Sequence, residues 1–347
     1  MPHAPRSSRA GHKAANNDTL VRKPLAAFLS LAGGLVLAGT AAAGSGFEPQ
    51  PPKTPGAEDI TDIYYFVAFF AAVVFLLVLV PLVLFVVRYR NRGHDQEREG
   101  PQIRGNTRLE LAWTAVPVLI VAAIMAFVLI KAPGINSEPA QAGDALQIRV
   151  EGRRFYWRYV YPNGAVAIDR LRVPVDRPVN LEITAPDSDV IHSYWIPELG
   201  GKFDAVPGDT NDFSFRATEV GVFPGNCGEF CGVQHAAMTA EAEVMPTETF
   251  DGWLAREGQT QARGDSDLGE AQWKGVCLKC HRLQGETYIG PNLGANTTLR
   301  QPDALEAIVR NGQGAMPPVG QGWSEREMKA LTDYTRTLVS EGGGDGS

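Results

Sequence analysis

The sequence of 347 residues predicts a multidomain chain, in which a two-helix transmembrane hairpin precedes an all-β domain and then an all-α domain. Three observations predict this order. Two uncharged apolar runs, 63–87 and 111–130, each reach the length of about 20 residues that a membrane helix needs. Short alternating segments with frequent turns follow, which is typical of strands. From Leu268 onward, the apolar residues recur at helical spacing.

The segment before the hairpin resembles a targeting sequence. Basic residues precede a short apolar stretch at 25–38, and small residues follow up to Ala43. This order is typical of a signal peptide, which we expect over 1–43. An uncleaved additional membrane helix is the alternative, although the stretch is short for a bilayer. The Pro-rich and Gly-rich residues that follow predict an extended leader over 44–59.

We expect the hairpin over 60–131, with helices at about 63–88 and 109–131. Pro81 and Pro117 are expected to kink or bound these helices, which membrane helices tolerate. The region between the two apolar runs is rich in arginine: Arg88, Arg90, Arg92, Arg98, Arg104 and Arg108. The positive-inside rule therefore predicts a cytoplasmic loop in a bacterial plasma membrane, with the later domains on the periplasmic side.

The all-β domain is expected over 132–257. Its predicted strands are 146–150, 155–161, 179–184, 213–215 and 240–245. Short strands with turns such as Pro162-Asn163-Gly164 indicate an antiparallel sandwich or barrel. His192 lies at a strand end, and a cysteine-rich loop precedes the last strand. A rigid sheet can present such residues from distant segments.

The remaining residues predict a short helix at 249–257, a flexible polar linker at 258–267, the all-α domain at 268–340 and a disordered tail at 341–347. Apolar residues at helical spacing in the all-α domain are Leu305, Ile308, Val309, Met328, Leu331, Tyr334 and Leu338.

The net charge and the positions of the cysteines limit the classes of function that the chain can have. The formal net charge of −7 gives nucleic-acid binding no electrostatic support. All four cysteines lie in two motifs, so no thiol remains for a separate structural disulfide. A pair of bare disulfides is the alternative, but it explains neither the histidine nor the methionine that accompanies each cysteine pair.

The first motif, C-G-E-F-C-G-V-Q-H-A-A-M, begins at Cys227 and contains Cys231, His235 and Met238. Thiolates, an imidazole and a thioether form a soft ligand set that suits copper rather than magnesium or calcium. Two thiolates four positions apart can hold two metal ions, and His192 is expected to complete the site from another loop.

The second motif, C-L-K-C-H, contains Cys277, Cys280 and His281 and is the attachment signal of a c-type haem. His281 supplies the proximal nitrogen, and Met316 in N-G-Q-G-A-M-P-P is the candidate sixth ligand. The alternatives are a chance match or a zinc ribbon for the motif, and a buried loop residue for Met316.

The segment H-S-Y-W-I-P-E-L-G-G-K-F-D-A-V-P-G, together with the first motif, resembles subunit II of cytochrome c oxidase over about 60–257. The resemblance implies a binuclear CuA centre in a cupredoxin-like Greek-key domain. The implied ligands are His192, Cys227, the main-chain carbonyl of Glu229, Cys231, His235 and Met238. It also implies that the Glu229 carboxylate helps to hold a magnesium or manganese ion against subunit I.

The region from about 268 to 340 resembles a class I cytochrome c domain, and the fusion resembles caa3-type oxidases. The implied function is to pass electrons from the haem and CuA to subunit I, which reduces oxygen to water and translocates protons. Implied partners are subunits I and III and a cytochrome c or bc1-type donor. Because no histidine lies in a membrane span, the oxygen chemistry must occur in a partner.

Two further assignments come from the resemblance. Phe155, Tyr156 and Trp157 match the family's electron route, except that the family has tryptophan where this chain has Phe155. Phe155 is therefore either on that route or a strand-packing residue. Glu110, in L-E-L-A-W-T-A-V-P, matches the mouth of the K proton pathway. The alternative is a solvated carboxylate at the membrane interface.

Three other classes share parts of the pattern. A copper-delivery protein of the Sco type uses two cysteines and a distant histidine, but it has one anchor and a thioredoxin-like fold. Nitrous oxide reductase shares CuA, but it is soluble and carries a propeller. The third class is a related subunit of a CuA-type nitric oxide reductase, which the sequence excludes less well than the other two. A partner subunit with the ligands of the oxygen site would distinguish an oxidase from these classes.

Overall fold

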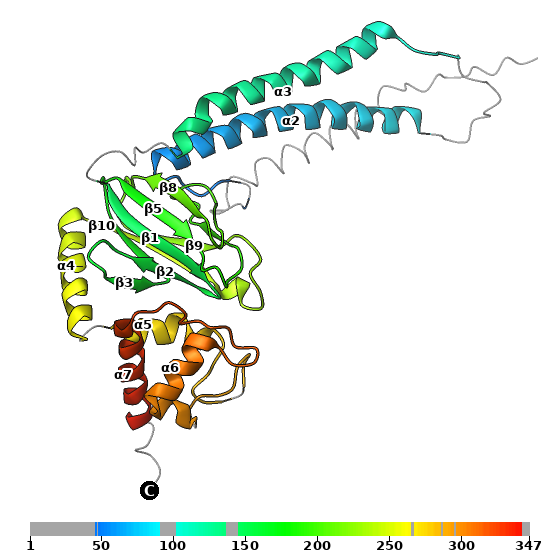
Figure 1. The fold of residues 1–347 in the computed structure, drawn as a ribbon. Helices are drawn as coiled ribbons and strands as arrows, with labels where there is room; N and C mark the ends of the chain where they lie inside the picture. Colours follow the sequence, from blue (N-terminus) through cyan, green and yellow to red (C-terminus); the bar gives the residue numbers. More distant parts are fainter. Residues whose placement is uncertain are drawn as a thin grey trace, which may run out of the picture. The chain divides into compact units, whose positions relative to one another are not determined.

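A computed structural model describes residues 46, 48–90, 102–136, 145–264, 267–285, 287–294 and 296–341 (Figure 1). The chain divides into two units, Met1–Pro49 and Gln50–Ser347, and the second contains the elements discussed below. The expected signal peptide and most of the expected tail lie outside the described residues.

Two long helices form the hairpin, α2 (Pro55–Tyr89) and α3 (Thr107–Ile135), and both are long and apolar enough to cross a membrane. They lie side by side in Figure 1, and the rings of Phe66 and Phe127 stack at 4.2 Å between centroids. Pro81 and Pro117 lie inside the helices rather than at their ends.

Helix α2 begins within the segment that the sequence predicted to be an extended leader. The Thr54 hydroxyl accepts a hydrogen bond from the Ala57 amide (3.0 Å) and donates one to the Leu199 carbonyl (2.8 Å). An N-cap of this kind satisfies an amide that the first turn of a helix leaves free. The cap fixes the start of the helix at Pro55 and ties it to the β domain.

The β domain is a sandwich of two five-stranded sheets with the orders β3-β2-β1-β5-β8 and β4-β10-β9-β6-β7. The strands are β1 (Leu146–Arg153), β2 (Tyr156–Val160), β3 (Val166–Ile168), β4 (Arg170–Pro174), β5 (Val179–Thr184), β6 (His192–Trp195), β7 (Phe203–Ala205), β8 (Thr210–Phe215), β9 (Gly221–Cys227) and β10 (Thr239–Met245). The sandwich confirms the all-β prediction, although the pairs β1–β5 and β4–β10 are parallel rather than antiparallel.

The core lies between the two sheets. In β1 the alternating residues Leu146, Ile148 and Val150 are buried, and the polar residues between them point away. A period of two along a strand places such residues on one face. The sequence pattern therefore decides which side of β1 faces the core.

Helix α4 (Thr247–Arg263) packs beside β4 and ends at Gly264 in the left-handed conformation (φ 83°). The side chain of Gln261 is buried; its oxygen accepts from the Val166 amide (2.9 Å) and its nitrogen donates to the Val166 carbonyl (2.7 Å). These bonds pair the edge strand β3 with a helix. Residues 258–263 are therefore helical, whereas the sequence predicted a flexible linker there.

The C-terminal domain is helical, as predicted. Its elements are α5 (Leu268–Gly275), η2 (Cys277–Lys279), η3 (Thr297–Arg300), α6 (Pro302–Asn311) and α7 (Glu325–Glu341). Its apolar core includes Trp273, Leu305 and Met328. Tyr156 and Ile168 of the sandwich belong to the same apolar cluster, so the two domains share a continuous packed region.

Candidate copper and haem sites

The copper loop joins β9 to β10, and its two ends are held together by the sheet. The Cys227 amide donates to the Met238 carbonyl (2.9 Å), which closes the loop immediately beside both side chains. A short 3₁₀ turn, η1 (His235–Ala237), then directs His235 back toward the cysteines. The antiparallel pair β9–β10 thus supplies a rigid base for the sulfur-rich segment.

The structure brings the proposed copper ligands together. The ligand atoms of His192, Cys227 and Cys231 all lie within 4.8 Å of one another, and the three side chains are buried. The two Sγ atoms are 4.0 Å apart, and Cys231 Sγ lies 3.7 Å from His235 Nδ1 and 3.8 Å from Met238 Sδ. Cys231 is therefore the central donor of the group. Two sulfurs flanked by imidazoles fit a soft binuclear metal site.

His192 is oriented by a carboxylate that the sequence did not single out. Its Nδ1 faces Cys227 Sγ at 4.0 Å, and its Nε2 donates to Asp189 Oδ1 at 3.2 Å. Although burial opposes the charged form, the bond to Asp189 raises the pKa of His192. A hydrogen bond at one ring nitrogen fixes the tautomer and leaves the other nitrogen for a metal.

The two thiols are electrostatically different. The hydrogen bond between the sulfurs holds the pKa of Cys227 well below its ordinary value and raises the pKa of Cys231. Deprotonated sulfur is the form that binds metal.

The main-chain carbonyl and the side-chain carboxylate of Glu229 lie in different surroundings. Its main-chain carbonyl lies 3.2 Å from Cys227 Sγ, beside the other donors. Its carboxylate is half exposed and lies 3.9 Å from the Lys202 ammonium. The carbonyl is therefore available to the copper site, and the carboxylate points outward from it.

In the helical domain, a largely apolar cavity of about 360 Å³ contains the predicted haem residues. Its lining includes Cys277, Cys280, His281 and Met316. Met316 is held in a tight turn, in which its amide and carbonyl both bond to Gln313 (3.0 and 3.1 Å). The structure thus brings both predicted axial residues to one cavity.

The geometry around His281 fits a haem. Its Nδ1 lies 2.8 Å from the Pro291 carbonyl, which leaves Nε2 as the free nitrogen. Gly290 packs against the ring so closely that a Cβ atom there would lie 2.4 Å from the nearest ring atom. Only glycine leaves room for the imidazole at this position. Metal-binding histidines are commonly oriented by such a hydrogen bond at the other ring nitrogen.

Two of the three residues of the aromatic segment, Phe155 and Trp157, lie near the predicted copper and haem residues. Phe155 lines the haem cavity, and its ring lies 3.1 Å from the position that a Cβ atom on Gly232 of the copper loop would occupy. Trp157 is fully buried, with its ring centroid 6.1 Å from that of His192. Tyr156 points the other way, into the helical domain, where its hydroxyl donates to the Val319 carbonyl (2.5 Å).

Glu110 lies in the first turn of α3, remote from both sites in the sequence. Its carboxylate accepts a hydrogen bond from the Asn106 amide (3.2 Å), which is a helix-cap interaction. Its side chain is exposed in this chain.

Sequence reasoning missed three residues at these sites, Asp189, Gln234 and Lys279. Gly290 was noted as the start of the segment G-P-N-L, but its contact with His281 was not expected. Asp189 had a usable signal, since it lies only three positions before His192. Gln234 and Lys279 had none for the bond between them, because they are 45 positions apart in the sequence.

These features define a membrane-anchored electron-transfer protein with two metal centres. Three family models match the chain: the cytochrome c oxidase subunit II transmembrane domain over 42–130, its periplasmic domain over 165–245, and cbb3-type cytochrome c oxidase subunit III over 264–334. The chain belongs to the cytochrome c oxidase subunit II family.

Individual relatives agree. Cytochrome c oxidase subunit 2 of Alkalihalophilus pseudofirmus is 31% identical over 83% of this chain and 89% of its own length. Cytochrome c oxidase subunit 2 of Bacillus subtilis is 30% identical, over 74% of this chain and 82% of its own length. The periplasmic domain of subunit II (CoxB) of Bradyrhizobium japonicum matches 33% of this chain and 94% of its own, at 30% identity and a TM-score of 0.32. The family assignment rests on the sequence matches.

Membership of the cytochrome c oxidase subunit II family confirms the predicted class of protein. The subunit II domains, followed by a cytochrome c domain, are consistent with a caa3-type fusion. They imply CuA copper in the sandwich, haem in the helical domain and assembly with oxidase subunit I. The chain is a membrane protein with an extracellular domain.

Proposed function

We propose that His192, Cys227, the Glu229 carbonyl, Cys231, His235 and Met238 hold the CuA pair, and that Cys277, Cys280, His281 and Met316 hold a c-type haem. When bound, these groups supply one-electron transfer from a donor, through the haem and the copper pair, to subunit I. The chain's own residues hold both centres rigidly and exclude water from them.

One observation carries the proposal. Cys231 Sγ lies within 4.0 Å of three other soft or nitrogen donors, from three separate positions of one loop. A structural disulfide between the two cysteines would not explain why His235 and Met238 also lie close to Cys231 Sγ. Buried sulfur and imidazole donors at this spacing favour copper over a hard cation.

Finer assignments are part of the same proposal. The outward Glu229 carboxylate contributes to a magnesium or manganese ion shared with subunit I. The chain crosses a bacterial plasma membrane twice, with the sandwich and helical domains on the periplasmic side. Subunit III and a cytochrome c or bc1-type donor complete the partners. Phe155, Tyr156 and Trp157 belong to the electron route. The position of Phe155 in the haem cavity and that of Trp157 beside His192 support this role.

The test uses the full chain matured with copper and haem. Electron paramagnetic resonance is expected to show an unpaired electron shared by two copper nuclei, and optical spectra a low-spin c-type haem. Metal analysis should find two coppers per chain, beyond any copper in subunit I. A single-copper hyperfine pattern, or oxidised Cys227 and Cys231 with no copper, would refute the assignment.

Replacing Glu110 with glutamine is expected to slow oxidase turnover of the assembled complex by about 10-fold, because the neutral amide cannot carry a proton. Reduction of the copper pair should keep its wild-type rate. Glu58→Gln, an exposed carboxylate in the first turn of α2, is the matched control and should leave turnover unchanged. Wild-type turnover in Glu110→Gln would remove Glu110 from the proton pathway.

A further inference from the structure

The cytochrome domain rests on the sandwich through a buried apolar contact. The Tyr156 side chain extends from β2 into the helical domain, where the Trp323 indole donates to its hydroxyl at 2.9 Å. The two rings meet edge to face with centroids 6.3 Å apart. Tyr156 is fully buried, so this surface is closed to water.

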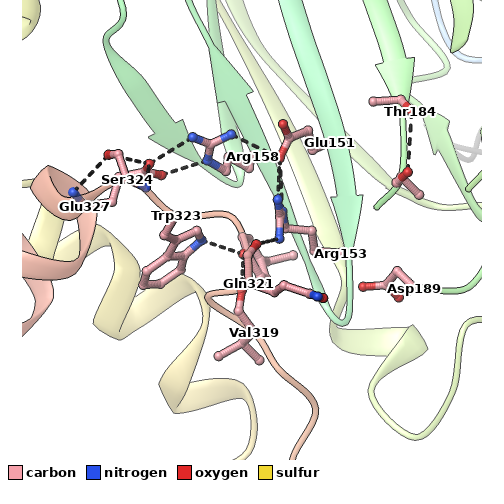
Figure 2. A network of polar contacts seen from close by, with 12 residues as sticks. Glu151, Arg153, Arg158, Thr184, Asp189, Val319, Gln321, Trp323, Ser324 and Glu327 are labelled. Carbon is pink, nitrogen blue, oxygen red and sulfur yellow. Dashed lines mark hydrogen bonds and ion pairs between the residues drawn. The ribbon is translucent and has the colours of Figure 1, made fainter. Parts of the chain in front are cut away.

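Beside this contact lies a charge cluster that crosses the two domains, formed by Glu151, Arg153, Arg158 and Glu327 (Figure 2). Arg158 binds Glu327 of α7 through two nitrogens, at 2.7 and 2.9 Å, and binds Glu151 of β1 at 3.0 Å through the third. Arg153 also pairs with Glu151 and donates to the Gln321 carbonyl. The cluster holds two positive and two negative groups.

The central pair of this cluster is almost completely buried. The Arg158 and Glu327 side chains are 9% and 2% exposed. Glu327 also accepts from the Ser324 amide and hydroxyl at 2.8 Å, which forms a capping box at the start of α7. The ion pair therefore attaches the N-terminal end of this helix directly to the sandwich.

A second attachment involves the haem motif itself. The Lys279 ammonium donates to the Phe155 carbonyl (2.8 Å) and to Asp169 (2.5 Å), both in the sandwich. Its own carbonyl accepts from the Gln234 side chain, which comes from the copper loop. Gln234 is buried and lies next to His235 in sequence. The segment between the two haem cysteines is thus bonded to the loop that carries the copper ligands.

We propose that the cytochrome domain is held in one docked position by the buried Arg158–Glu327 pair, and that both are positioning residues for electron transfer between haem and copper. The inference rests on the proposed function, because it assumes that both cofactors occupy their sites. It differs from a simple tether, in which a flexible linker only raises the local concentration of the donor. Here the chain itself fixes the distance and orientation.

The charges explain why removing a single partner should disrupt docking. Burial alone raises the pKa of Glu151, but Arg158 and Arg153 outweigh it and hold that pKa below its ordinary value. Each buried charge is therefore compensated by a neighbour. Removing Arg158 leaves Glu327 as an uncompensated charge when docked, whereas undocking returns it to water.

The experiment compares Arg158→Met with wild type in the assembled, fully loaded complex. The docked fraction is expected to fall on the order of 100-fold. Flash-induced electron transfer from haem to copper should slow about 10-fold or more, and become dependent on solvent viscosity. Arg149→Met is the matched control, since Arg149 is exposed and pairs with Glu182 at 3.8 Å on the sandwich surface. That control should keep the wild-type rate.

Spectra, midpoint potentials and protease cleavage of the Arg158→Met variant distinguish a positioning role of Arg158 from a merely structural one. In Arg158→Met the haem spectrum, the two-copper resonance and both midpoint potentials should match wild type, while protease cleavage between α4 and α5 should accelerate. The double variant Arg158→Met, Glu327→Gln removes both charges but keeps a capping residue, so it should recover most of the rate. Wild-type, viscosity-independent transfer in Arg158→Met would overturn the proposal. Failure of the cofactor assignment would show instead as abnormal spectra in wild type.

Discussion

Replacing Cys231 with serine is expected to abolish the two-copper resonance and to lower oxidase turnover by more than about 100-fold. Cys231 Sγ is the donor that contacts Cys227, His235 and Met238, at 4.0, 3.7 and 3.8 Å. A hydroxyl is harder than a thiolate and does not bridge two copper ions at neutral pH. The variant should bind one copper at most, which metal analysis and electron paramagnetic resonance would measure.

The same loop supplies a control for this variant. Ala236→Ser places a hydroxyl on an exposed residue of the loop, so it should keep both coppers and wild-type turnover. The haem spectrum should be normal in both variants, because the haem residues lie in another domain. If Cys231→Ser kept two coppers with an unchanged hyperfine pattern, the binuclear assignment would fail.

Replacing Met316 with alanine is expected to convert the haem from low-spin to high-spin and open it to added ligands such as cyanide or imidazole. Met316 lines the cavity with His281, and its turn is fixed by two bonds to Gln313. Losing an axial ligand also lowers the haem potential, so reduction of the haem by its own electron donor should become at least about 10-fold less favourable. Optical spectra and redox titration would measure both effects.

A second methionine of the same domain tests whether the effect is specific. Met328 is buried in the apolar core, so Met328→Leu keeps its volume and should leave the haem low-spin. Thermal unfolding of both variants would show whether the domain remains folded. An unchanged low-spin spectrum in Met316→Ala would exclude Met316 as the axial ligand.

Local sequence patterns were enough to predict much of the fold. The strand 179–184 was predicted with its observed limits, because its residues alternate and turns bound it. Strands β3 and β7, of three residues each, were missed because such short segments carry no periodicity of their own. Strand β9 contains Pro224 and Gly225, which weaken a strand pattern, and a Cβ atom at Gly225 would lie 2.5 Å from the Trp195 carbonyl.

The site was predictable where its chemistry is local in sequence. The cysteine motifs named most of the residues that the structure gathers at the copper loop and in the haem cavity. The role of Gln234 was not predictable, because its partner Lys279 is 45 positions away and only the fold brings the two together. The helix through Arg263 was missed for the same reason, since the buried contact of Gln261 with Val166 outweighs the polar composition.

The short connection after α4 determines which copper pair each haem can serve. Helix α4 ends at Arg263 and α5 begins at Leu268, so the intervening chain can span at most about 18 Å. Because α4 packs against β4, the haem domain stays within this reach of its own sandwich. Every complex therefore carries its own donor in one-to-one ratio, however crowded the membrane becomes.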